Sequence, residues 1–214
     1  MSDEFAEIEA LLEKAAEGHG ESWQELLEPH RHKLRKMVAI RMDARLQSRI
    51  DASDVVQESF LEAWNRLEEF LRDRKTSFFL WLRFLTGQKL VTLHRHHLGT
   101  HMRDADREVS LYRGALPEAS SAMLAAQLLG GDPRPSEIAV RAEIKVRLQE
   151  ALNQMDSIDR EVLSLRHFEH LNREETAKVL GMQESATSKR YVRALRKLKA
   201  ILNTMPGGME ELLG

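Results

Sequence analysis

Hydrophobic residues recur at helical spacing along almost the whole chain, and no convincing segment alternates as a half-buried strand would. The clearest amphipathic stretch follows Ser53, where Val56, Phe60, Trp64 and Leu67 form one apolar stripe. Ser53 has a side chain that can cap the first turn of such a helix. The pattern therefore predicts an all-α fold.

The same periodicity predicts helices elsewhere in the chain. They are expected at residues 3–17, from residue 22 to about 40, at 77–97, from 137 onward, and at 183–201. Pro29 complicates the second of these, because a proline inside a helix removes one backbone hydrogen bond.

Periodicity weakens between residues 104 and 136, where glycine and proline are frequent. This stretch predicts a flexible linker, with a short helix at about 121–129. A chain of 214 residues is long enough for two small domains with separate cores. The expected segments are an acidic helix in 1–20, a helical domain at 21–103, the linker at 104–136, a second helical domain at 137–203 and a tail at 204–214.

Charge adds information through its distribution, since the net charge is only −2. Residues 1–29 contain nine acidic residues and one lysine, whereas residues 31–49 contain seven Lys or Arg against Asp43 alone. The helix at 183–201 has six basic residues against Glu184. A protein that coats nucleic acid by bulk charge is excluded, but a local basic surface is indicated.

Several functional classes are excluded or disfavoured by what the sequence lacks. There is no cysteine, no signal-peptide pattern and no apolar run long enough to span a bilayer, so a cytoplasmic protein is expected. His94, His97 and His101 share helical spacing, but no acidic partner accompanies them, and a metal site is not expected. No phosphate loop or nucleophile–base motif is visible. We therefore expect no enzyme activity, no cofactor and no metal.

The C-terminal part has the pattern of a helix-turn-helix. Asn172 and Glu175 have capping-box spacing, and Gly181 suits the left-handed end of a short helix. The following helix places four apolar side chains inward and a polar, basic side outward. The inward residues are Tyr191, Ala194, Leu195 and Leu198; the outward residues are Ser185, Lys189 and Arg193, with Ser188 nearer the edge. Arg190 and Arg193 could read guanine or hold phosphates, and the sequence does not separate these roles.

The N-terminal part combines two patterns. Opposite the apolar stripe after Ser53, an acidic and amide face suits contact with a protein; it consists of Asp54, Gln57, Glu58, Glu62 and Asn65. The next segment mixes aromatic rings with cations, which is typical of sites where unpaired bases stack while cations follow the phosphates. Its candidate contact residues are Phe70, Arg74, Lys75, Thr76, Arg83 and Lys89.

These motifs resemble bacterial sigma factors of the sigma-70 family. Region 2 is matched by residues 54–60 (DVVQESF), Ala63-Trp64, Phe70 and Trp81-Leu82, and region 4 by the stretch from Asp159 to Leu198. The order of the two regions, with only a linker between them, resembles the extracytoplasmic-function (ECF) group. Gln88, Thr92 and the pair Ala186-Thr187 depart from the family's usual residues, which bears on the promoter sequence but not on the class.

The resemblance implies a function and partners. The Asp54–Asn65 face is expected to dock on the clamp helices of the largest subunit of core RNA polymerase, and the loop after Phe70 to capture a flipped base of the −10 element of promoter DNA. The −35 element would be read by Arg173, Ser185, Ser188, Lys189, Arg190 and Arg193. Small members of this family are commonly held by an anti-sigma factor, so such a partner is also expected.

One alternative stays open at this point. A polymerase-independent helix-turn-helix regulator with an N-terminal ligand-binding or dimerisation domain would share the C-terminal pattern. It predicts tight duplex binding by the isolated protein and no affinity for core polymerase, whereas a sigma factor predicts the reverse.

Overall fold

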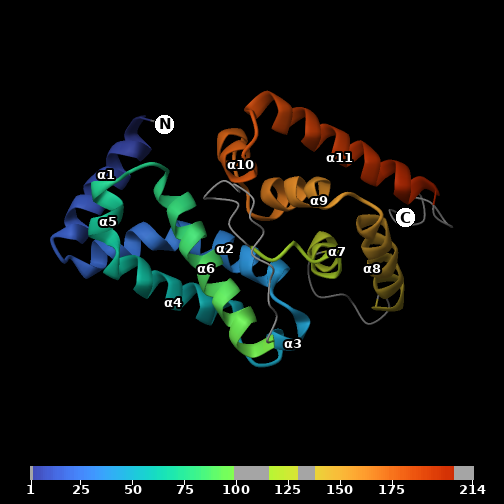
Figure 1. Ribbon diagram of the computed structural model, residues 1–214, viewed down its shortest axis with the longest axis horizontal. Helices are drawn as coiled ribbons and strands as arrows, with labels where there is room; N and C mark the ends of the chain where they lie inside the picture. Colours follow the sequence, from blue (N-terminus) through green and yellow to red (C-terminus); the bar gives the residue numbers. More distant parts are fainter. Residues whose placement is uncertain (1, 99–115, 130–137, 205–214) are drawn as a thin grey trace. The chain divides into compact units, whose positions relative to one another are not determined.

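The computed structural model describes residues 2–98, 116–129 and 138–204, and it is drawn in Figure 1. Every regular element in these ranges is a helix, as the periodicity predicted. The chain divides into two compact units, one of residues 1–38 and 43–103 and the other of residues 39–42 and 104–214. None of the described helices combines the length and the apolar composition needed to cross a bilayer.

The first unit is built from six helices, with α2 counted as far as residue 38, and its packing centres on α4 and α6. They are α1 (Ser2–Ala16), α2 (Gly20–Arg41), α3 (Ala44–Gln47), α4 (Ala52–Asn65), α5 (Leu67–Arg72) and α6 (Phe78–Leu98). α2 runs through Pro29 without a break, and Pro29 is exposed. At the turn between α1 and α2, Gly18 has a φ of 94°, a conformation that favours glycine.

The start of α4 differs from the prediction by two residues. Its N-cap is Asp51, whose carboxylate accepts a hydrogen bond from the backbone N–H of Ser53 at 2.6 Å. This bond holds the pKa of Asp51 below its usual range. The prediction that Ser53 caps the helix was therefore wrong, although both residue types favour this position.

Aromatic rings fill the core of the first unit next to α6. Phe70 stacks on Trp81 with ring centroids 4.5 Å apart, and Phe78 meets Phe70 edge-on at 5.7 Å. Trp23 packs on Trp64 at 5.3 Å. These contacts bring α2, α4, α5 and α6 onto one cluster, which fixes the loop between α5 and α6 at both ends.

The second unit contains the remaining helices. They are α7 (Ser121–Leu129), α8 (Ile138–Asn153), α9 (Ser157–Leu163), the π-helix η2 (Ser164–Phe168), α10 (Arg173–Leu180) and α11 (Glu184–Thr204). α7, the short helix expected within the stretch 104–136, packs on α8. The sequence pattern did not predict η2. The expected tail begins at Thr204, and its residues 205–214 lie outside the described part of the chain.

The turn between α10 and α11 confirms the local signals of the sequence. Asn172 and Glu175 form a complete capping box, and Gly181 ends α10 in the left-handed conformation with a φ of 62°. Ala194 is fully buried, as expected, but Leu195 is 36% exposed, so its predicted inward position was wrong.

Candidate docking and nucleic-acid interfaces

The acidic and amide face of α4 is presented to solvent. Asp54, Gln57, Glu58 and Asn65 are exposed, and Glu62 is half-buried. On the opposite side, Val56 and Phe60 are buried in the core, so the register of the helix is set by its apolar stripe. α4 thus offers these five polar residues without any change in its own packing.

An apolar residue that the sequence pattern did not single out lies within this face. The side chain of Leu61 is 64% exposed, more than any other large hydrophobic side chain among the described residues. A leucine surrounded by carboxylates and amides is a typical centre of a protein interface, where an apolar contact is ringed by polar ones. The sequence could have indicated Leu61 through its position, because it directly follows Phe60 and lies outside the apolar stripe of the helix.

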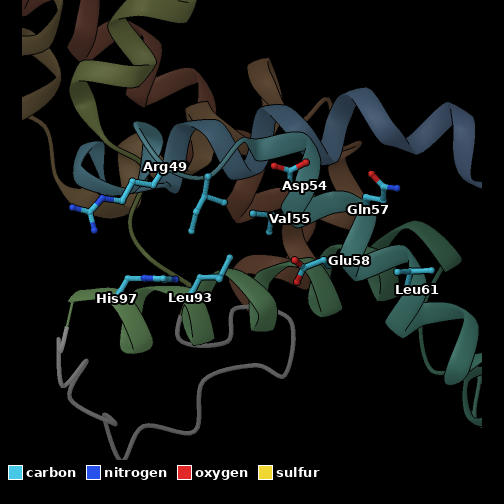
Figure 2. Close-up of a pocket in the computed structure, with 9 residues that line it drawn as sticks. Arg49, Asp54, Val55, Gln57, Glu58, Leu61, Leu93 and His97 are labelled. Atoms are coloured by element: carbon cyan, nitrogen blue, oxygen red, sulfur yellow. The ribbon is translucent and has the colours of Figure 1, made fainter.

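A groove of about 500 Å³ runs between α4 and α6 next to this face. Arg49 and His97 lie at one end of it and Leu61 at the other (Figure 2). The remaining lining residues are Ile50, Asp54, Val55, Gln57, Glu58 and Leu93. The groove therefore joins the predicted docking face to the exposed end of α6.

Two residues predicted for different partners meet at this place. The ammonium of Lys89 on α6 forms an ion pair with the carboxylate of Glu58 on α4. Lys89 was predicted to contact a single strand and Glu58 to contact the polymerase. In this structure each neutralises the other, so the docking face and the basic side of α6 are electrostatically linked.

The loop between α5 and α6 carries the predicted single-strand contacts Arg74, Lys75 and Thr76. Arg74 and Lys75 are exposed, and Thr76 is partly buried with a hydroxyl that has no hydrogen-bond partner. Arg74 forms an ion pair with Glu9 of α1, and Lys75 lies 2.6 Å from the carboxylate of Asp73. The loop thus presents two cations close together in sequence, which can contact phosphates, whereas the Thr76 hydroxyl is itself buried.

Two other predicted single-strand contacts lie in the core. Phe70 is 5% exposed and forms part of the aromatic cluster, and Arg83 is 1% exposed. A side chain without accessible surface cannot contact DNA in this conformation. The expectation for Phe70 and Arg83 is therefore corrected. Phe70 packs in the aromatic cluster next to the loop, and the side chain of Arg83 is buried in the core of the first unit.

The outer face of α11 presents the predicted −35 contacts unequally. Ser185, Lys189 and Arg193 are exposed, Ser188 is partly exposed, and Arg173 is exposed at the first turn of α10. Arg190, in contrast, points to α9, where its Nη1 donates to Oδ1 of Asp159 at 2.8 Å. The side chain of Asp159 is only 4% exposed and that of Arg190 25%, so this ion pair holds α11 on α9, and a DNA contact by Arg190 stays a prediction.

A small pocket lies where α10 and α11 meet. It has a volume of about 150 Å³ and is lined by Arg166, Arg173, Thr187, Ser188, Tyr191 and Val192. The guanidinium of Arg166 lies over the ring of Tyr191, 5.5 Å from its centroid, and the hydroxyl of Tyr191 is 2.9 Å from Nε2 of His167. Two arginines without a carboxylate among the lining residues suit an anion. Sequence analysis missed Arg166, because only the fold brings it to Arg173 and Ser188.

The histidines at the end of α6 do not form a metal site among the described residues. No group of three or more metal-ligating side chains occurs in this part of the chain. The buried ring of His94 accepts a hydrogen bond from the backbone N–H of Asp43 at 3.3 Å, and burial lowers its pKa. His94 is thus a neutral structural residue, and His101 lies outside the described residues.

Comparisons with known proteins agree with this arrangement. The family model of sigma-70 region 2 matches residues 26–98, and that of sigma-70 region 4 matches residues 145–198. The first contains α4, α6 and the loop before α6, and the second contains α10 and α11 as far as Leu198.

Curated relatives extend the similarity beyond these two segments. The RNA polymerase sigma factor CnrH of Cupriavidus metallidurans is 30% identical over 154 residues, which cover 72% of this chain and 74% of CnrH. NccH of Alcaligenes xylosoxydans xylosoxydans is 28% identical over 92% of this chain and 95% of its own length. The ECF RNA polymerase sigma factor SigD of Mycobacterium tuberculosis is 28% identical over 93% of this chain and 85% of SigD.

A solved structure of CnrH in complex with the cytosolic domain of CnrY has a TM-score of 0.52 and 25% sequence identity to this chain. The matched part covers 90% of this chain and 95% of the CnrH chain. Together, the two matched regions and the similar relatives place this chain in the ECF group of the sigma-70 family of RNA polymerase sigma factors.

Proposed function

We propose that this chain binds core RNA polymerase through α4 and brings it to promoters by contacting the −10 element with the loop before α6 and the −35 element with α11. In this role it is an initiation factor without chemistry of its own, and it acts in the cytoplasm, where polymerase and chromosome meet. The single observation that carries the proposal is the composite face of α4, with exposed Leu61 among Asp54, Gln57 and Glu58.

The docking step depends on this face because the face has no role in the core of the first unit. An exposed leucine contributes little to folding but can be buried against a partner's helix, which makes it a candidate for the apolar centre of the interface. The carboxylates and amides around it would hydrogen-bond to the partner and set the register of docking. We assign this partner surface to the clamp helices of the largest polymerase subunit.

DNA contact is assigned to two separate places. In the first unit, Arg74, Lys75 and Thr76 would hold the unpaired strand, and Lys89 would contribute once Glu58 has turned to the polymerase. In the second unit, Ser185, Ser188, Lys189 and Arg193 face the major groove, and Arg173 and Arg166 would hold a backbone phosphate in the pocket between α10 and α11.

An anti-sigma factor is a further proposed partner. CnrH has been solved in complex with a second protein, the cytosolic domain of CnrY. We propose that a comparable protein occupies the groove between α4 and α6 in this chain. Such a partner would cover Leu61 and thereby compete with core polymerase for the same surface.

The test is binding of purified core RNA polymerase to the full chain, followed by run-off transcription on genomic fragments. Leu61→Ala and Gln57→Ala are each expected to weaken core binding about tenfold, a loss of about 1.4 kcal/mol of binding free energy. Gln24→Ala, an exposed amide elsewhere on the first unit, is the matched control. Circular dichroism should show an intact fold in all three variants.

The outcomes separate the candidate functions. Core binding with promoter-dependent transcripts, weakened by the α4 variants only, supports the proposal. Unchanged core binding in both α4 variants would refute the docking assignment. Tight duplex binding without any core affinity would instead indicate a polymerase-independent regulator.

A further inference from the structure

The acidic helix α1 has no part in the proposed function, yet it contacts the proposed single-strand loop directly. The carboxylate of Glu9 accepts a charge-assisted hydrogen bond from the guanidinium of Arg74. α1 is anchored to the first unit by Leu12 and Ala15, which are both buried. The ion pair therefore joins two parts of one folded unit that lie far apart in sequence.

Both cations of the loop have a carboxylate partner in this structure. Lys75 is paired with Asp73, a residue of the loop itself, whereas the partner of Arg74 comes from a different helix. Phosphates of a single strand need the same N–H groups that Glu9 now occupies. A phosphate and Glu9 are thus alternative ligands of Arg74.

We propose that Glu9 is an internal competitor of single-stranded DNA for Arg74 and lowers the affinity of the unassembled protein for an unpaired strand. The inference rests on the proposed function of the loop. DNA that binds Arg74 displaces Glu9 and so breaks the ion pair between the loop and α1. The acidic helix then modestly raises the concentration of unpaired DNA that strand capture needs, and the local concentration at a promoter that polymerase is melting meets this need.

The size of the effect follows from the exposure of the pair. The side chains of Arg74 and Glu9 are 35% and 51% exposed, so water and salt screen their attraction. Pairs of this kind are weak, and we expect loss of the competitor to tighten DNA binding about two- to fivefold at low salt. A larger reduction of the DNA affinity would require a buried ion pair, and this pair is not buried.

The experiment measures binding of the full chain to a fluorescent single strand of mixed sequence, about 15 nucleotides long, by anisotropy. Glu9→Gln should tighten binding about two- to fivefold. Glu13→Gln is the matched control, since it removes the same charge from another exposed position of α1. Its gain should be clearly smaller, because it reports only the general charge of the helix. In an Arg74→Gln background, Glu9→Gln should give no gain beyond that of Glu13→Gln.

Each other outcome refutes the inference in a recognisable way. Equal gains for Glu9→Gln and Glu13→Gln would show general repulsion rather than competition for Arg74. Weaker binding by Glu9→Gln would show that Glu9 positions Arg74 for DNA. If Arg74→Gln alone left binding unchanged, the proposed function of the loop would fail together with the competition, whereas a loss with Arg74→Gln and no gain with Glu9→Gln would refute the competition only.

Discussion

The ion pair between Arg190 and Asp159 makes a quantitative prediction for the stability of the second unit. Arg190→Met removes the guanidinium beside Asp159 and keeps a long, unbranched side chain. Removing one partner of a buried ion pair costs about 3–5 kcal/mol. Here a quarter of the Arg190 side chain is exposed, and Lys197 lies 3.8 Å from the second oxygen of Asp159. Both reduce the penalty, so we expect the second unit to lose about 2–3 kcal/mol of its free energy of unfolding.

The two units can be followed separately during urea unfolding. All three tryptophans, Trp23, Trp64 and Trp81, belong to the first unit, so tryptophan fluorescence reports that unit alone. Far-ultraviolet circular dichroism reports the helices of both units. With an m-value of about 1–2 kcal/mol/M for a unit of this size, Arg190→Met should move the dichroism component of the second unit down by about 1–3 M urea. The fluorescence transition should stay where it is.

Two further variants separate stability from DNA contact. Lys189→Met, one residue away and exposed, should change the free energy of unfolding by less than about 0.5 kcal/mol and weaken duplex binding. Asp159→Asn should destabilise the second unit, and its effect should be less than additive with Arg190→Met because the two residues share one interaction. The reasoning would be refuted if Arg190→Met unfolded at the wild-type urea concentration and lost duplex binding as Lys189→Met does.

Three other predictions concern the two units. Burial and nearby Lys33 lower the pKa of His30 to about 4, whereas a histidine in the unfolded chain titrates near 6.5. As the pH falls, the unfolded state therefore binds the proton first. The first unit should lose about 1–3 kcal/mol of its free energy of unfolding between pH 7 and pH 4. His30→Gln should reduce this loss in urea titrations at each pH, and a pH dependence unchanged from wild type would contradict the assignment. Phe70→Leu should lower the free energy of unfolding of the first unit by about 1–2 kcal/mol, measured by tryptophan fluorescence, because Phe70 stacks on Trp81. Weaker binding of a single strand at unchanged stability would instead indicate that Phe70 stacks on a base. Asn172→Ala should cost the second unit about 1 kcal/mol in dichroism-detected unfolding, while Asn172→Ser should keep most of that stability, and equal losses would argue against the cap.

Features that depend on near neighbours in the chain were predicted well. The apolar stripe of α4, the capping box at Asn172 and the left-handed turn at Gly181 all involve residues within about one helical turn of each other. Even the error at the start of α4 was local, since Asp51 and Ser53 are both good caps and only the backbone geometry selects between them.

Roles of single charged and aromatic side chains were predicted less well. Arg83 follows a continuous run of buried residues from Phe78 to Leu82, so α6 has no single apolar stripe from which an exposed side could be inferred. Phe70 has the chemistry of a base platform and equally that of a core ring. Leu61 was overlooked because a lone leucine beside an apolar stripe has the same pattern whether it is covered or exposed.

Residue identity and helical period were thus enough for the helix-rich fold, the two-region organisation and the polar and basic faces. The resemblance to sigma factors added polymerase and promoter DNA as the expected partners. Carboxylates distant in sequence decide which cations on those faces are ion-paired. Asp159 lies 31 residues from Arg190, and Glu9 lies 65 residues from Arg74. A helix can position only residues three or four places apart, so pairings over such separations arise when whole helices pack together. The class of protein therefore follows from local motifs and the family that they resemble, whereas the ion pairs that its arginines form follow from packing.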